Sequence, residues 1–131
     1  MALKSSMKIL IADASPGNRQ VLKKMLSDIG FKNVQEAGDE VKAWDKIIED
    51  IEKPVEFVIS EWELPKGSGL GLLKKIREDQ NTKSTKFLMV TGEAAQQNVV
   101  IAVKSGVNNV VVRPFSANIL MEKISKIFGQ S

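Results

Sequence analysis

Four short apolar runs of this sequence are each followed by a polar side chain that could bind an ion or take part in oxygen chemistry. Asp13 follows "ILIA", Glu61 follows "FVIS", Thr91 follows "FLMV" and Arg113 follows "VVV". Hard divalent cations prefer carboxylate oxygens, and a guanidinium binds a carboxylate or another anion through a fixed fork of donors. A further carboxylate, Glu63, comes just after Glu61. These five positions form the candidate site.

The composition removes several other kinds of chemistry. The 131 residues include no cysteine and no histidine. Disulfides, thiolate nucleophiles, zinc sites with the usual ligands and a serine-histidine-aspartate triad are therefore excluded. What remains is chemistry on oxygen atoms, or a role without chemistry.

Charge and hydropathy favour a cytoplasmic protein. The net charge of +3 comes from 19 basic and 16 acidic residues, and the basic ones form no dense block. A nucleic-acid partner is therefore not expected. No apolar segment approaches the roughly 20 residues that span a bilayer, and the start "MALKSSMK" lacks the apolar core of a signal peptide, so we expect no membrane association.

Apolar runs alternate with stretches whose apolar residues recur every three or four positions. This pattern predicts strands at residues 8–12, 34–37, 55–60, 87–91 and 110–112, and helices at 18–29, 41–51, 70–78, 95–105 and 117–128. Most of the strands are almost continuously apolar, which is typical of a parallel sheet with helices on both faces. We expect one α/β domain over residues 7–129, with residues 1–6 as an N-terminal extension.

Strict alternation of strands and helices also predicts where the candidate residues meet. Right-handed crossovers produce a doubly wound sheet, and ligands of such sheets bind outside the carboxyl ends of the strands. All the candidate residues follow strands. We therefore expect a group of carboxylates, a hydroxyl and a guanidinium at one edge.

The segments "ILIADAS", "FVISEWELPKGSGLGLLKKIR", "LMVTGEA" and "VVVRPF" resemble the receiver domain of bacterial two-component response regulators. "GFKNVQEA" and "SEWELP" are similar to the single-domain, CheY-like chemotaxis branch. The resemblance covers roughly residues 8–128. It implies a flavodoxin-like sheet of five strands in the order 2-1-3-4-5, with five helices on its two faces.

The family's phosphoryl-accepting and metal-binding positions can be matched one by one. The resemblance implies an acidic pair after the first strand, but this sequence has Asp13 followed by Ala14. It implies an aspartate acceptor after the third strand, where this sequence has Glu61. The receiver is therefore predicted to be degenerate at both positions. We expect no cofactor, or at most weak Mg²⁺ binding through Asp13, Glu61 and the backbone of Glu63.

The family's switching positions are partly kept. Thr91 matches the hydroxyl after the fourth strand, and Arg113 replaces a lysine before the expected cis-proline. Val110 occupies the position of an aromatic switch residue in the fifth strand. Because valine offers no ring to swing inward, we do not expect this coupling to operate.

Two further readings of the carboxylates follow from their chemistry. Asp13 is either a metal ligand or a strand-end carboxylate held by backbone N–H groups. Glu61 is expected to form a bidentate pair with Arg113 that fixes the pocket in one state, since a guanidinium is longer than an ammonium and suits a carboxylate. A permanently activated receiver is the less favoured reading, because glutamate carries less charge than a phosphoryl group.

Three functions stay open at this point. The first is a non-enzymatic signalling domain that binds a sensor kinase, an effector or a motor component, independently of phosphorylation, through residues 96–104, 110–112 and 117–126. The second is a weakly active, Mg²⁺-dependent phosphoacceptor using Glu61 or Ser60. The third is a flavodoxin-like binder of small molecules at the same edge, with Arg113 facing an anionic ligand.

Overall fold

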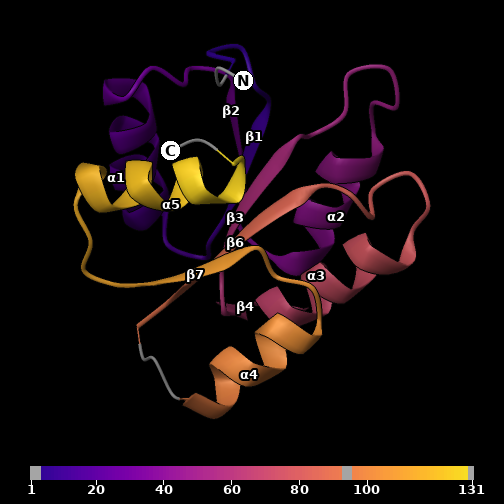
Figure 1. Cartoon of the computed structure of the whole chain (residues 1–131). Helices are drawn as coiled ribbons and strands as arrows, with labels where there is room; N and C mark the ends of the chain where they lie inside the picture. Colours follow the sequence, from indigo (N-terminus) through magenta and orange to yellow (C-terminus); the bar gives the residue numbers. More distant parts are fainter. Residues whose placement is uncertain (1–3, 93–95, 130–131) are drawn as a thin grey trace.

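Figure 1 shows the computed structural model, in which a parallel sheet lies between two layers of helices. The structure describes residues 4–92 and 96–129. The sheet has the order β2-β1-β3-β6-β7, formed by β1 (Ile9–Ala12), β2 (Val34–Ala37), β3 (Phe57–Glu61), β6 (Lys86–Thr91) and β7 (Asn109–Val112). All four strand pairings in this sheet are parallel. The predicted order 2-1-3-4-5 is confirmed, with β6 and β7 as the fourth and fifth strands.

Helices cover both faces of the sheet, as the sequence predicts. Figure 1 shows α1 (Pro16–Asp28) and α5 (Ala117–Ile127) on one side, and α2 (Glu40–Ile48), α3 (Gly69–Glu78) and α4 (Gln96–Lys104) on the other. Each face has its own apolar core because successive strand residues point to opposite sides. The first core includes Ile9, Ile11, Leu26, Ile59 and Ile124, and the second includes Leu10, Val58, Leu72, Ile76 and Met89.

Some helix limits differ from the predicted ones for local reasons. Helix α1 begins at Pro16, before the predicted start, because the Ser15 hydroxyl accepts a hydrogen bond from the Asn18 amide and proline suits the first turn. Helix α2 ends at Ile48, before the predicted end. The Asp50 carboxylate instead accepts a hydrogen bond from the Lys53 amide, which forms a turn. The predicted start of the fourth helix at residue 95 lies outside the described residues.

A short antiparallel hairpin follows β3 where the sequence predicted only a loop. Its strands are β4 (Glu63–Leu64) and β5 (Gly67–Ser68). The buried Glu40 carboxylate holds this hairpin: its Oε1 accepts a hydrogen bond from the Ser68 amide at 2.9 Å. Its Oε2 lies 2.7 Å from Lys75 Nζ on α3. Glu40 therefore ties α2, the hairpin and α3 together beside the end of β3.

Gly69 lets helix α3 begin directly against the end of β3. Its amide donates to the Trp62 carbonyl at 2.7 Å. A Cβ atom at this position would lie 2.2 Å from the Glu61 carbonyl oxygen and 3.0 Å from Met89 Sδ. Only glycine permits this contact, so the residue also fixes the backbone that carries the Glu61 side chain.

Helix length bears on the expected absence of membrane association. Within residues 4–92 and 96–129, no helix combines the length and apolarity needed to cross a bilayer.

Replacing Gly69 with alanine is expected to destabilise the fold by about 1–3 kcal/mol, because the new methyl group overlaps backbone that cannot move away easily. Urea unfolding measures this change. Gly17→Ala is the matched control, since its Cβ would lie 3.7 Å from the nearest heavy atom, Ser15 Oγ. This control should be neutral or stabilising by up to about 1 kcal/mol. Equal stability of Gly69→Ala and the wild type would contradict the packing described for α3.

Candidate functional site

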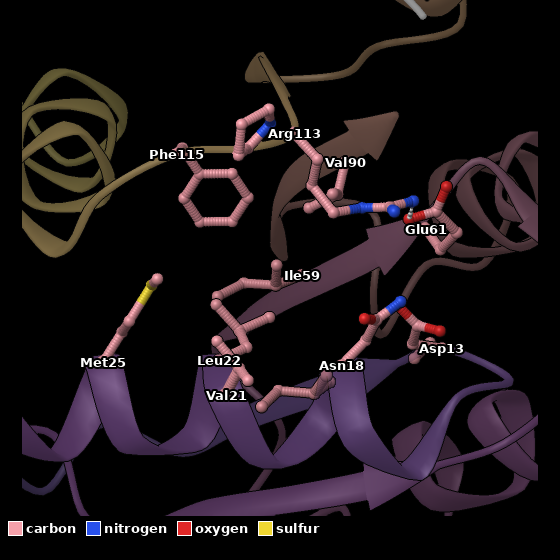
Figure 2. A pocket seen from close by; sticks show the side chains of 13 residues that line it. Asp13, Asn18, Val21, Leu22, Met25, Ile59, Glu61, Val90, Arg113 and Phe115 are labelled. Carbon is pink, nitrogen blue, oxygen red and sulfur yellow. Dashed lines mark hydrogen bonds and ion pairs between the residues drawn. The ribbon is translucent and has the colours of Figure 1, made fainter. Parts of the chain in front are cut away.

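A cavity of about 180 Å³ opens at the carboxyl edge of the sheet, between α1 and the segment that links β7 to α5. Figure 2 shows its polar side chains, from Asp13, Asn18, Glu61 and Arg113, gathered toward one end. Val21, Leu22, Met25, Ile59, Val90 and Phe115 provide most of its apolar wall. The cavity thus has an apolar body and a charged rim.

The predicted contact between Glu61 and Arg113 is present at this rim. Glu61 is the last residue of β3, and Arg113 follows β7, where its amide donates to the Thr91 carbonyl at 2.9 Å. Arg113 Nη2 donates a hydrogen bond to Glu61 Oε2. The predicted bidentate grip is not formed, because this is the one hydrogen bond between the two side chains. Arg113 Nε is buried and has no hydrogen-bond partner.

Asp13 is held by the start of helix α1. Its Oδ1 accepts a hydrogen bond from the Ser15 amide at 2.9 Å. Its carbonyl accepts from Arg19 Nη1 at 2.6 Å, while Arg19 Nε donates to Glu36 Oε1 at 3.1 Å. The strand-end carboxylate held by a backbone N–H, one of the two readings of Asp13, matches this geometry.

Glu63 does not join the acidic pocket that the sequence predicted. It lies in β4, paired with Ser68, and its side chain is exposed and absent from the cavity wall. The hairpin turns the chain away from the sheet edge immediately after Glu61. Glu63 remains close enough for its charge to act on Glu61.

Thr91 and Val110 lie on the opposite side of the sheet from the cavity. Val90 lines the cavity, so Thr91, the next residue of β6, points the other way. Thr91 is buried, and Val110 packs against the core beneath α2 and α3. The predicted edge therefore holds Asp13, Glu61 and Arg113 in one cavity and leaves Thr91 outside it.

Ser60 is inaccessible, although the sequence left it open as a phosphoryl acceptor. Its exposed fraction is 0%, and its hydroxyl donates to the Glu61 carbonyl at 3.0 Å. In-line attack needs an open approach to the oxygen that receives the phosphoryl group. Ser60 offers none in this structure.

Burial dominates the electrostatics of Glu61. Its side chain is 11% exposed, and this burial raises the pKa of the carboxyl above its ordinary value of 4.5. The hydrogen bond and the charge of Arg113 lower the pKa in part, while the charges of Asp13 and Glu63 raise it further. The ion pair therefore compensates only part of the cost of burying this carboxylate.

The donor set does not suit a resident Mg²⁺ ion. Within the described ranges 4–92 and 96–129, no three acidic, histidine or cysteine side chains are grouped so that they could hold a metal. At the sheet edge, the Glu61 carboxylate is engaged by Arg113, Asp13 Oδ1 is engaged by a backbone amide, and Ala14 has no side-chain oxygen. Mg²⁺ requires near-octahedral oxygen coordination, which this arrangement does not prepare.

Sequence reasoning missed several residues that shape the site. Asn18, Met25 and Phe115 line the cavity, but each lies in or before a helix rather than at a strand end. The position of Asn18 in the first turn of α1, behind the Ser15 cap, could have placed it at the sheet edge. Nothing in the local sequence marks Glu40 as a buried clamp.

Comparison with known proteins decides the family. Residues 9–125 match the family described as the response regulator receiver domain. The chain belongs to this receiver family. It is 37% identical over 123 residues to chemotaxis protein CheY1 of Helicobacter pylori, covering 94% of this chain and 98% of that protein. It is 40% identical over 126 residues to chemotaxis protein CheY-3 of Vibrio cholerae, covering 96% and 95%.

Solved structures agree with this receiver assignment. The chemotaxis response regulator CheY4 of Vibrio cholerae superposes with a TM-score of 0.83 at 25% identity, covering 93% of this chain and 98% of that one. A putative response regulator from Chloroflexus aurantiacus has a TM-score of 0.86 at 23% identity, covering 95% and 99%, and shows the shared fold. The predicted CheY-like receiver of the chemotaxis and two-component type is confirmed.

The raised pKa of Glu61 predicts a specific pH dependence of stability. From pH 4.5 up to the folded-state pKa, the native receiver keeps a proton that the unfolded chain has released. The contribution of Glu61 to the free energy of unfolding therefore falls as pH rises through this window. Urea unfolding of the wild type and of Glu61→Gln at several pH values should show the wild type losing stability relative to the variant. A relative gain with rising pH would contradict the dominance of burial.

Proposed function

We propose that this receiver domain signals by presenting a protein-binding surface and does not require phosphorylation. The observation that carries the proposal is the contact of Glu61 with Arg113. Glu61 occupies the position of the acceptor in the receiver family, and its carboxylate is already bound by a cation. The domain is then a binding module rather than an enzyme, and Glu61 is a fixed charge.

Phosphoryl transfer to Glu61 would need several things that this edge does not supply. The reaction depends on in-line positioning and on a metal that neutralises developing charge. The extra methylene of glutamate displaces the carboxylate, and a misplacement of about 1 Å can cost on the order of 100-fold in rate. Ala14 removes a metal ligand at the same time. Both changes oppose the same reaction.

The competing function is a weakly active, Mg²⁺-dependent phosphoacceptor. Burial of Ser60 leaves Glu61 as its acceptor. To react, Glu61 would have to leave Arg113 and share a metal with Asp13, which lines the same cavity. Ala14 has no side-chain oxygen that could bind the metal, and the Arg113 guanidinium already binds the Glu61 carboxylate. Both features disfavour this route.

The proposed partner surface consists of α4, β7 and α5, called the α4–β7–α5 face below. Exposed apolar side chains are found on all three elements: Val100, Ile101, Val103, Val112 and Ile119. Apolar groups gathered on one face are typical of a surface that binds another protein. The partner class is a sensor kinase, an effector or a motor component in the cytoplasm, without nucleic acid or membrane.

The position of the switch residues is the reason why we expect the α4–β7–α5 face to be the same with and without phosphorylation. Val110 is partly buried against the core that includes residues of α2 and α3, and no tyrosine occurs in the chain. β7 therefore has no aromatic side chain that could change its rotamer and transmit a conformational change from the strand ends to the α4–β7–α5 face. The proposed output is accordingly the same with and without a phosphoryl donor.

Val100→Glu is expected to reduce partner capture from native-cell lysate by tenfold or more, since a buried unpaired charge in an interface costs several kcal/mol. Val41→Glu on α2 is the matched control, because both valines are 45% exposed. This control should retain the same partners as the wild type. The amounts captured are measured by quantitative mass spectrometry, with and without acetyl phosphate and Mg²⁺.

Addition of acetyl phosphate and Mg²⁺ should leave wild-type capture unchanged. Capture that appears only with the phosphoryl donor would contradict phosphorylation independence. Equal capture by Val100→Glu and the wild type would contradict the choice of surface.

A further inference from the structure

Helix α2 has an apolar stripe that is exposed to solvent. Val41 and Ile48 are seven residues apart, which places them on one side of the helix, and Trp44 lies between them. Val41 and Ile48 are each 45% exposed, while Trp44 is partly buried against the core. Ile51 follows the end of α2 and is 76% exposed. These four side chains, called the α2 stripe below, form an apolar surface of the kind that binds a protein.

The fold keeps the α2 stripe apart from the partner surface proposed above. Strand β2, which leads into α2, is at one edge of the sheet, and β7 is at the other edge. Figure 1 shows α3 between α2 and α4 on one face of the sheet. A protein bound at the α2 stripe therefore leaves the α4–β7–α5 face free.

A row of charged side chains with alternating signs runs beside the stripe. Its members line one hollow of the surface near the end of β2: Lys42, Asp45, Lys46 and Glu49. Along the chain the signs are plus, minus, plus and minus. The row therefore carries the opposite sign at every position when it is read backwards. Two such rows are complementary if the helices that carry them lie antiparallel.

Contacts within one chain leave this row available to a second molecule. Lys46 Nζ lies 4.0 Å from Glu49 Oε1, and the two side chains are 43% and 49% exposed. Exposed pairs of this kind contribute little to stability, so both groups can exchange partners at little cost. In the part of the chain that the structure describes, the side chains of Lys42 and Asp45 form no ion pair.

Two-fold symmetry brings the charges of two copies into register. An axis perpendicular to α2 that passes between Asp45 and Lys46 places the same side of each helix against the other, in antiparallel directions. Lys42 then faces Glu49 of the second copy, and Asp45 faces Lys46 of the second copy. Symmetry repeats both contacts, so every charge of the row meets its opposite.

The same arrangement covers the apolar side chains. Val41 lies against Ile48 and Ile51 of the second copy, because the N-terminal end of one helix meets the C-terminal end of the other. A uniformly acidic or uniformly basic partner would match the row less well, since it would meet a like charge at every second position. The surface therefore suits a second copy of this chain.

We propose that this chain associates as a two-fold symmetric dimer through antiparallel contact of the two α2 helices. The α2 stripe supplies apolar burial, and the charge row fixes the direction of the helices. A contact made by one short helix of each copy is small, so the association is weak and reversible. The dimer carries one free α4–β7–α5 face on each copy, and only the use of these faces for signalling rests on the proposed function.

Sedimentation equilibrium of the full chain measures the association directly. The average mass should rise from 14.4 kDa toward twice this value as the concentration increases to about 1 mM, a range in which weak association is detected. Val41→Glu places a charge in the stripe and should lower the association constant by about tenfold or more. Val100→Glu on α4 is the matched control with the same 45% exposure, and it should associate as the wild type does.

Three results of this measurement would overturn the proposal. The first is a wild type that stays monomeric over the whole concentration range. The second is equal association of Val41→Glu and the wild type. The third is loss of association in Val100→Glu, which would place the contact on the α4–β7–α5 face.

Charge reversal tests the antiparallel register. Lys42→Glu places glutamates opposite each other at both symmetric contacts, and Glu49→Lys places lysines opposite each other there. Each variant alone should associate more weakly than the wild type by about tenfold or more, with its fold checked by circular dichroism. A mixture of the two variants should associate as the wild type does, because every reversed charge then meets its opposite. Undiminished association of either variant alone, or no association in the mixture, would overturn the proposal.

Discussion

The contact between Glu61 and Arg113 joins the carboxyl ends of two strands that are not neighbours in the sheet. Glu61 ends β3 and Arg113 follows β7, with β6 between them. The pair forms one part of the cavity rim and engages the carboxylate at the position that the sequence predicts for the acceptor. The Glu61 backbone is positioned in turn by Gly69, whose Cα has no room for a side chain beside the Glu61 carbonyl. The chemical character of the whole edge depends on this one contact.

Glu61 and Arg113 meet at this edge, at the positions where the resemblance to the receiver family predicts an aspartate and a lysine. The two side chains form a direct hydrogen bond, which offsets part of the free-energy cost of burying the Glu61 carboxylate. The pKa of Glu61 still stays above its ordinary value. A pair of this kind holds its partners in place more than it stabilises the fold, because burial of charge offsets much of the attraction. Arg113 contributes a second feature, an Nε atom that is buried without a hydrogen-bond partner.

Sequence patterns predicted the layers and the meeting of Asp13, Glu61 and Arg113, because these follow from hydrophobic periodicity and from the geometry of parallel sheets. The strand order came from the resemblance to the receiver family, and the structure confirms it. They placed Glu63 wrongly, since a two-residue strand such as β4 has no periodicity to read. They also grouped the Thr91 hydroxyl with these side chains, whereas the alternation of β6 turns Thr91 to the other face of the sheet from Val90 and the cavity. Glu40 and Phe115 act through tertiary contacts, for which local sequence contains no signal.

Intact-mass measurement after incubation with acetyl phosphate and Mg²⁺ tests the central claim, that Glu61 is a fixed charge and not an acceptor. The wild type is predicted to gain no phosphoryl group. The triple variant Ala14→Asp, Glu61→Asp, Arg113→Lys restores the residues implied by the receiver family, so it serves as the control and should gain one. A phosphoryl adduct on wild-type Glu61 would contradict the account.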